Sequence, residues 1–479
     1  MKPSVHLILS ENRRTLSLAV PIISGHLGQM LMGWVDAVMV GRVGVVPLAA
    51  CGFANTLLSV PLVFGFGLLS AVSVRASHSY GGGRPQEAGE SIRGGFGVAL
   101  ILSVPLLLAL YGILPHIWIF GQPHEVNAAV RGYLILCGWS LVPVFLTCVS
   151  KNFCEALGRP WEPFWIMMGG VLLNALLAWV LIFGKWGAPA MGLTGAGLAT
   201  LLARIVVMAA VFAYPLLSRS LREAWPSDWF AGGAGVAIAR ILSIGLPAGA
   251  LHLCEVSGFA MGSLMMGWLG VIPLAAHQIA ITCGATTFMV PLGLSQAVCV
   301  RVGRARGAGH QERLRPIIFG ALGLAVVVMG MFAVVFMLCG KSISGWFVSD
   351  PQVVFLTSQL LFIAGVFQIF DGVQVVSSGA LRGFEDTRIP MFIGILSYWV
   401  VVLPVSWVAG FALGGGAQGV WFGFVVGLVV AAGALLWRVL WRIGRTAEKS
   451  QGCSQAPKTA ATENSGGSDL RHKHSGLSG

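Results

Sequence analysis

Three carboxylates lie inside long apolar segments of this chain. Asp36 falls in PIISGHLGQMLMGWVDAVMVG, Glu255 in GLPAGALHLCEVSGFAMGSLM and Asp371 in LLFIAGVFQIFDGVQVVSSGAL. An ionised side chain at the centre of a bilayer costs about 2.5–3.5 kcal/mol on insertion scales. Any one acid could join helices by bonding to amides, but a neutral amide would do that at lower cost. The three acids together therefore indicate a protein that binds or moves cations.

The spacing of other polar residues places them on the same helix faces as these acids. Gln29 precedes Asp36 by seven residues, which is nearly two helical turns. Around Asp371, the side chains of Gln368, Gln374 and Ser378 recur at three- and four-residue spacing. Such a polar stripe on an apolar helix must face the bundle interior or water rather than lipid.

Three more polar residues of the first half are candidates with open alternatives. The amide oxygen of Asn174 suits a hard cation, although the amide could equally join two helices. Thr200 is favoured to bond its own backbone, and Arg204, one turn further on, could snorkel to the interface or pair with an acid. Three histidines have no ligand spacing and are expected to be hydrogen-bonded core residues: His26, His252 and His277.

The composition fixes the class of protein that must position these groups. The chain has 479 residues, of which 56% are hydrophobic and only 10% charged, too few charges to cover a soluble surface. Long apolar runs without period-two alternation predict helices rather than a barrel. We expect twelve membrane-spanning helices near 15–38, 48–74, 94–115, 128–149, 162–184, 190–215, 239–264, 272–299, 316–340, 353–378, 389–412 and 416–440.

The net charge of +12 reports topology rather than a nucleic-acid partner. With a cytoplasmic N-terminus, nearly all basic residues fall in cytoplasmic segments, and Lys151 and Arg382 are counted among them. The opposite face then carries only four bases: Arg42, Arg131, Lys185 and Lys341. This asymmetry follows the positive-inside rule and predicts that both termini are cytoplasmic.

The chain contains one unit twice. A spacing of 226 residues separates Pro21 from Pro247, VVPLAA (45–50) from VIPLAA (271–276) and GLLSAVSVR (67–75) from GLSQAVCVR (293–301). Six helices per unit make this a parallel repeat. We therefore expect two pseudo-symmetric six-helix bundles in an all-α integral membrane protein, with lobes at 1–215 and 239–445, a cytoplasmic linker at 216–238 and a disordered polar tail at 446–479.

At this point the chain resembles a known family. The segments VVPLAA, AAHQIA (275–280), VRVGRARGAG (300–309) and FDGVQVVSSGALRGFEDTRIPM (370–391) are similar to the multidrug and toxic compound extrusion (MATE) transporters, NorM branch, over roughly residues 10–442. The resemblance implies a V-shaped pair of bundles in a bacterial inner membrane. It also implies export of amphipathic organic cations in exchange for Na⁺ or H⁺ by alternating access. We further expect a monomer among membrane lipid, without a cofactor.

The resemblance also implies site residues. The cation-coupling positions are Asp36, Glu255, Asp371, Asn174 and Thr200, with Na⁺ held by Glu255 and Asp371. Substrate contacts are expected from the three acids and from Gln278, Gln368, Gln374 and Phe367. Two positions depart from the family pattern, because Ala178 replaces an amide and Phe367 replaces a tyrosine of some relatives. Both remove an oxygen ligand and leave H⁺ coupling open at the first-lobe site.

Other functions fit the sequence less well. No Ser-His-Asp arrangement, metal-ligand cluster or P-loop is present, so the chain is not expected to be an enzyme, and energy must come from an ion gradient. The runner-up is a lipid-linked oligosaccharide flippase of the same superfamily. Its anionic substrates would need deep bases, of which Arg204 is the only one expected here. A channel would need a pore-ring pattern, and the two halves carry unlike acids.

Overall fold

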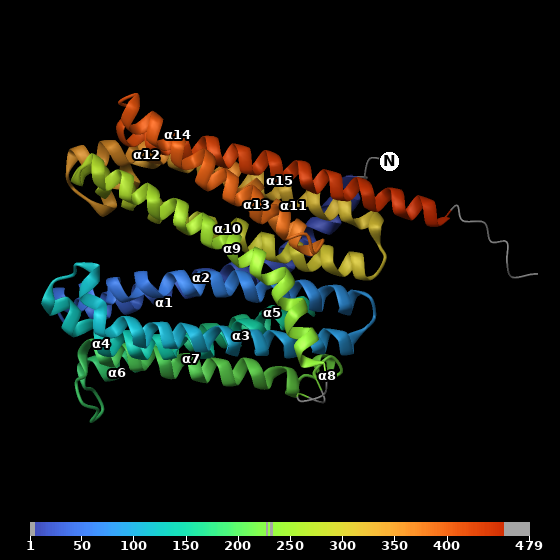
Figure 1. The fold of residues 1–479 in the computed structure, drawn as a ribbon, viewed down its shortest axis with the longest axis horizontal. Helices are drawn as coiled ribbons and strands as arrows, with labels where there is room; N and C mark the ends of the chain where they lie inside the picture. Colours follow the sequence, from blue (N-terminus) through green and yellow to red (C-terminus); the bar gives the residue numbers. More distant parts are fainter. Residues whose placement is uncertain (1–4, 227–228, 230–232, 455–479) are drawn as a thin grey trace, which may run out of the picture.

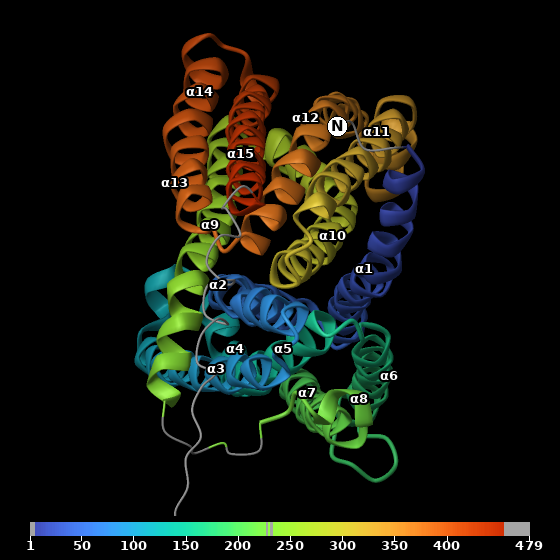
Figure 2. The same ribbon diagram turned by 90° about the vertical axis from the view of Figure 1, so that its right-hand side faces the viewer.

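The computed structural model describes residues 5–226, 229 and 233–454, which are almost entirely helical. Within them, twelve helical spans are long and apolar enough to cross a membrane, as the sequence predicts. Figures 1 and 2 show these spans as two groups stacked against each other, which we call the N-terminal bundle (α1–α7) and the C-terminal bundle (α9–α15). The expected all-α fold of two six-helix bundles is confirmed.

The N-terminal bundle ends with a short helix in the linker. Its elements are α1 (Val5–Gly41), α2 (Val45–Gly81), α3 (Pro85–Ile113), the 3-10 turn η1 (Leu114–Phe120), α4 (His124–Trp139), α5 (Leu141–Ala156), α6 (Trp161–Phe183), α7 (Gly192–Leu217) and α8 (Arg219–Arg222). The span expected at 128–149 is thus two helices, α4 and α5, which meet at Ser140.

The C-terminal bundle contains one irregular span. Its elements are α9 (Ala234–Leu269), α10 (Val271–Gly307), η2 (Gln311–Arg313), α11 (Leu314–Phe347), α12 (Pro351–Gly383), α13 (Arg388–Ile395), η3 (Leu396–Val402), α14 (Leu403–Trp407), η4 (Val408–Ala412) and α15 (Gly416–Ser454). Wide π turns form η3 and η4, around Pro404, which has no N–H for a regular bond. Helix α15 continues past the expected boundary at 445, and 455–479 lie outside the described residues.

The bundles exchange the first halves of their first helices. Ala19 and Ile22 of α1 are buried in a core formed mainly by α10, α11, α12 and α15. Ile241 and Ile244 of α9 are buried in the core of the N-terminal bundle. Helix α9 packs so closely on α2 that a side chain at Gly245 would overlap the backbone of Leu68. Helices α1 and α9 therefore link the two bundles mechanically.

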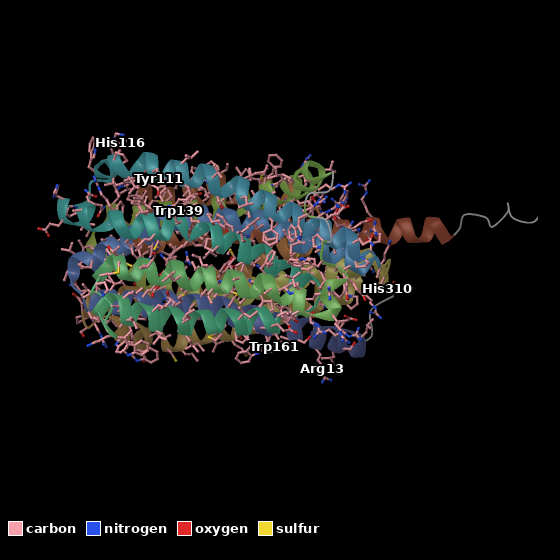
Figure 3. All side chains as sticks on the ribbon, turned by 90° about the horizontal axis from the view of Figure 1, so that it is seen from below. Arg13, Tyr111, His116, Trp139, Trp161 and His310 are labelled. Carbon is pink, nitrogen blue, oxygen red and sulfur yellow. The ribbon has the colours of Figure 1, made fainter. Side chains whose placement is uncertain are left out.

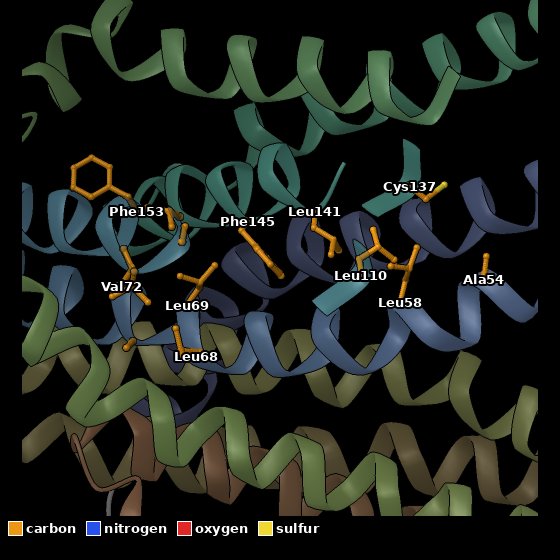
Figure 4. Packing of buried hydrophobic residues seen from close by; sticks show 14 of the residues in the cluster. Ala54, Leu58, Leu68, Leu69, Val72, Leu110, Cys137, Leu141, Phe145 and Phe153 are labelled. Atoms are coloured by element: carbon orange, nitrogen blue, oxygen red, sulfur yellow. The ribbon is translucent and has the colours of Figure 1, made fainter. Parts of the chain in front are cut away.

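The rest of the N-terminal bundle packs around large apolar side chains. Figure 4 shows Phe145 of α5 lying between α2 residues such as Leu69 and the neighbouring helices. Phe145 is fully buried, and its ring lies where a Cβ at Gly65 of α2 would stand. The glycine therefore lets two helices approach closely around an aromatic ring, as is common in membrane bundles.

The two bundles are sealed at one end of the molecule. Gly81 at the end of α2 lies against the backbone of Arg304, and its repeat partner Gly307 in α10 lies against the carbonyl of His78. Arg304 also donates from Nε (2.8 Å) and Nη2 (2.6 Å) to the carbonyl oxygen of Ala156. Figure 3 shows nitrogen-rich side chains at the end that carries Arg13 and His310, and this is the sealed end.

Candidate functional site

A cavity of about 660 Å³ lies between the two bundles and is lined by both. Helices α1, α2, α4, α5, α6 and α7 contribute one wall, and α9, α10 and α12 contribute the other. Much of the lining is apolar and flexible, with Met30, Met32, Met167, Met168 and Met289 among its residues. Methionine side chains adapt to ligands of different shape, so this lining suits a varied cargo.

Asp36 of α1 lies on the N-terminal wall and is held by neighbours on two other helices. Asn174 of α6 donates from Nδ2 to Asp36 Oδ1 at 2.7 Å, and the fully buried Asn174 Oδ1 accepts no hydrogen bond from the described residues. The Thr200 hydroxyl and the Arg204 guanidinium of α7 also interact with the Asp36 carboxylate. This acid therefore has a base beside it and an unused amide oxygen behind it.

The structure resolves two alternatives left open for α7. The Thr200 hydroxyl donates to the carbonyl oxygen of Ala196 at 3.0 Å, so it does bond its own helix, as favoured, as well as facing Asp36. Arg204 does not snorkel away from the bundle, because its Nη1 donates to Ser140 Oγ at 2.6 Å and the residue lines the cavity. Arg204 is therefore part of the Asp36 site.

Glu255 of α9 lies on the C-terminal wall within a separate hydrogen-bond network. Gln374 of α12 donates from Nε2 to Glu255 Oε1 at 2.7 Å, and His252 Nδ1 lies 3.1 Å from Glu255 Oε2. The Gln374 amide also exchanges hydrogen bonds with the Tyr398 hydroxyl, at 3.1 and 3.2 Å. The π turn η3 places this buried tyrosine, which then fixes the amide that faces Glu255.

Asp371 lies behind the wall rather than on it. Its side chain is buried in α12 and interacts electrostatically with Glu255 and Tyr398. Among the described residues, no group donates a hydrogen bond to the Asp371 carboxylate, and no arginine or lysine forms an ion pair with Asp371 or Glu255. These two acids therefore share one region without a strong base to neutralise them.

The expected site residues thus divide into three groups. Asp36, Glu255 and Thr200 line the cavity. The expected substrate contacts Gln368, Gln374 and Phe367 are buried behind it, as are Asn174 and Asp371, and Gln278 is exposed elsewhere on α10. Gln368 accepts from Thr287 Oγ1 at 3.0 Å, and Phe367 packs on Trp421 with ring centroids 5.5 Å apart. These two side chains are occupied in joining helices.

The histidines do not behave alike. His277 is a satisfied core residue, because Trp421 Nε1 lies 3.1 Å from its Nδ1 and Ser263 Oγ lies 2.9 Å from its Nε2. His26 and His252 instead line the cavity, and His26 Nε2 is buried without a partner among the described residues. The expectation of a core histidine therefore holds for His277 alone.

Two bases of the cavity were missed by sequence reasoning. Lys151 of α5 and Arg382 of α12 were assigned to cytoplasmic segments, but both line the cavity, so Arg204 is not the only deep base. The reason is that the helices extend beyond their apolar cores, and the cavity reaches into these extensions. A signal existed for Arg382, because it continues the polar stripe of Gln374 and Ser378 at four-residue spacing.

Comparison with known proteins gives the family. A model of the MatE family matches residues 21–180 and 247–408, two segments that begin at the first pair of the internal repeat. The "Probable multidrug resistance protein NorM" of Agrobacterium fabrum is 35% identical over 453 residues, covering 91% of this chain and 95% of the relative. The "Multidrug resistance protein MdtK" of Yersinia pseudotuberculosis is 31% identical over 439 residues, covering 90% and 95%.

A solved structure shows the same fold. The crystal structure of a MATE protein in the bent conformation superposes with a TM-score of 0.85 at 20% identity, covering 94% of this chain and all of the other. The repeat, the twelve spans and the central cavity agree with the family match in both halves. This chain, a multi-pass membrane protein, belongs to the MATE family.

Proposed function

We propose that this protein is a secondary active multidrug antiporter that exports amphipathic organic cations in exchange for Na⁺ or H⁺. The observation that carries the proposal is the cavity, into which Asp36 and Glu255 project from opposite bundles. An apolar, methionine-rich pocket with a few charged groups fits an amphipathic cation of drug size. Relatives named as multidrug resistance proteins support this function.

The coupling ion would act on the carboxylates behind and beside the cargo. Glu255 and Asp371 interact electrostatically with no strong base beside them, so a proton or a bound cation would stabilise the pair. The described residues contain no cluster of three His, Cys, Asp or Glu side chains that could hold a metal. A Na⁺ ion at Glu255 and Asp371 would therefore need amide or hydroxyl oxygens, such as Gln374 Oε1, to complete its ligands.

Alternating access would follow from the two-bundle architecture. The seal formed by Gly81, Gly307 and Arg304 closes the cavity at the basic end of the molecule. By the positive-inside rule this end, with both termini, would face the cytoplasm of a bacterial inner membrane. Ion entry from outside would then favour one packing of the bundles, and cargo entry from inside the other. This requires each ligand to bind the two states with different affinity.

One transport experiment tests this proposal. Proteoliposomes are loaded with a fluorescent organic cation, and a Na⁺ gradient and a pH gradient are imposed separately. We expect one of the two gradients to drive movement of the dye against its own gradient, which identifies the ion. Dye movement that follows only its own gradient would indicate a channel and would overturn the antiport proposal.

A lipid-linked oligosaccharide flippase is the second candidate, and one observation favours it. Lys151, Arg204 and Arg382 all line the cavity, more bases than the sequence suggests. Two of these bases already have a carboxylate partner, since Lys151 Nζ lies 3.4 Å from Glu155 Oε1 and Arg204 faces Asp36. The proteoliposome assay separates the candidates, because a flippase would not pump a water-soluble cation.

A further inference from the structure

Arg382 is a buried base that the antiport proposal does not use. It lies near the end of α12 and lines the cavity, with only 5% of its surface exposed. Its Nη2 donates to Ser295 Oγ at 2.9 Å, but its buried Nε has no partner. Among the described residues, no carboxylate lies within ion-pair distance of this guanidinium.

A buried guanidinium without a counter-charge is costly, because its desolvation is not repaid by a partner. A structural role as a link between α12 and α10 would need only a neutral donor to Ser295, as glutamine could supply. The planar fork of arginine is instead suited to bind a carboxylate through two parallel hydrogen bonds. Because the described residues give Nε no acceptor, the Arg382 guanidinium keeps an unused donor.

The opposite bundle contributes a second base and further donors to the same cavity. Lys151 of α5 lines it with 12% of its side chain exposed, and its partner Glu155 is not among the lining residues. The amides of Asn152 and Gln296 also line the cavity. Both bases lie in the cytoplasmic-side extensions of their helices, Arg382 one residue before the end of α12 and Lys151 five before the end of α5.

These groups are separated from the acids along the helix axis. Gln374, which donates to Glu255, precedes Arg382 by eight residues, or roughly 12 Å of helix. The cavity therefore has an acidic region at Glu255 and Asp36 and a basic region nearer the sealed end. A cargo that carries a cation at one end and an anion at the other could satisfy both regions at once.

We propose that Arg382 and Lys151 form a carboxylate-binding subsite within the cargo cavity, which determines how strongly this transporter binds amphipathic zwitterions relative to purely cationic cargo. This inference rests on the proposed function, since it adds a second contact within the same cargo cavity. The amine of such a cargo faces Glu255 or Asp36, and its carboxylate accepts hydrogen bonds from Arg382 and charge stabilisation from Lys151. A cargo that is only cationic uses the acidic region alone.

A matched pair of dyes tests the subsite. A rhodamine free acid is a zwitterion, and its methyl ester is a cation with the same ring system. Binding of both dyes to the purified full-length protein in nanodiscs is measured by fluorescence anisotropy. We expect Arg382→Gln to weaken binding of the free acid by at least about tenfold, as for a lost charge-assisted contact, and binding of the ester by less than about twofold.

Further variants keep this test decisive. Lys151→Gln should give a smaller loss in the same direction, and Arg382→Lys should lie between wild type and Arg382→Gln, because it keeps the charge but not the fork. Arg84→Gln, at a base that is half-exposed and outside the cavity, is the matched control and should change neither dye. Retained binding of the ester shows that each variant is folded.

The outcomes separate the two proposals. Equal losses for acid and ester, or no loss for either in both variants, would overturn the carboxylate subsite while leaving the antiporter proposal intact. If the wild-type protein binds neither dye, the cargo proposal itself fails, and the subsite fails with it.

Discussion

The two bundles share one architecture but place different chemistry at equivalent positions. Asp36 in α1 corresponds to Gly262 in α9, where the ring of Phe424 fills the space that a side chain would need. Asp371 in α12 corresponds to Thr147 in α5, whose hydroxyl bonds the carbonyl of Pro143 in its own helix at 2.7 Å. Duplication thus preserved the backbone, while each half kept its own acids.

The electrostatic surroundings of the two acid sites differ as much as their positions. Asp36 has the Arg204 guanidinium beside it and accepts a hydrogen bond from Asn174. Glu255 and Asp371 interact with each other, and their polar neighbours are Gln374, Tyr398 and a histidine. The site in the C-terminal bundle therefore needs an added positive charge more than the Asp36 site does, and we expect it to dominate coupling.

The largest effect is expected from neutralising the C-terminal site. The double substitution Glu255→Gln and Asp371→Asn should lower ion-driven efflux by roughly a hundredfold or more. Each substitution removes a carboxylate that would pair with the coupling ion. Truncating one partner of a buried charge pair costs about 2–5 kcal/mol, and each 1.4 kcal/mol is about tenfold. Initial rates of dye efflux from energised cells measure the loss, with the amount of protein in the membrane determined in parallel. Cells that carry both substitutions and still show full drug resistance would contradict the coupling role.

A smaller effect is expected at Asp36, because Arg204 already compensates its charge. Asp36→Asn alone should lower the efflux rate by about tenfold, and Arg204→Gln in the same chain should restore part of it. Residues that interact electrostatically within one polar network, as Asp36 and Arg204 do, show such non-additive effects in double-mutant cycles. If the losses from Asp36→Asn and Arg204→Gln simply add, Arg204 does not compensate the charge of Asp36. The Asp36 site would then resemble the Glu255 and Asp371 site electrostatically.

The sequence predicts the twelve spans, their repeat and the three acids, and each of these predictions has a physical reason. Long apolar helices and the repeat of Pro21 at Pro247 fix the number and pairing of spans, because a bilayer allows few alternatives. The acids of α1, α9 and α12 were conspicuous since charge is costly in apolar segments. These signals gave the fold and the three candidate acids.

The side-chain partners could not be read in the same way. The contacts of Glu255 with Gln374 and of Gln374 with Tyr398 join residues that are 119 and 24 positions apart, and they depend on how helices rotate and on the π turn η3. The charge pattern places Lys151 and Arg382 in cytoplasmic segments, because hydropathy cannot show that a cavity reaches past the apolar core. The position of a polar residue along a membrane-spanning helix does not reveal whether its side chain faces the cavity, a neighbouring helix or lipid.

Tyr398→Phe should have a moderate effect on coupling, and it tests how much the hydrogen-bond network of Glu255 contributes to the difference between the two acid sites. It removes the hydroxyl that positions the Gln374 amide, and one neutral hydrogen bond contributes about 0.5–1.5 kcal/mol. We expect the concentration of coupling ion for half-maximal efflux to rise roughly three- to tenfold. Tyr111→Phe is the matched control, since Tyr111 is exposed and, among the described residues, accepts only from Trp139 Nε1 at 2.9 Å. Equal shifts in both variants would place the cause outside the Glu255 network.

The smallest effect is expected at Thr200, and it tests how the Asp36 site is built. Thr200→Val keeps the shape of the side chain but removes a hydroxyl that already donates within α7 to Ala196. Because that proton is engaged at 3.0 Å, the hydroxyl can offer Asp36 little beyond its dipole, and the half-maximal ion concentration should change by less than about threefold. Asn174→Leu, which removes the 2.7 Å bond to Asp36 and the unused amide oxygen, should shift the half-maximal ion concentration more.

If Thr200→Val is the more damaging of the two, the hydroxyl must bind the coupling ion directly. The Asp36 site would then coordinate a cation through oxygen ligands, and the contrast with the C-terminal site would lie in the kind of ion bound rather than in the strength of coupling.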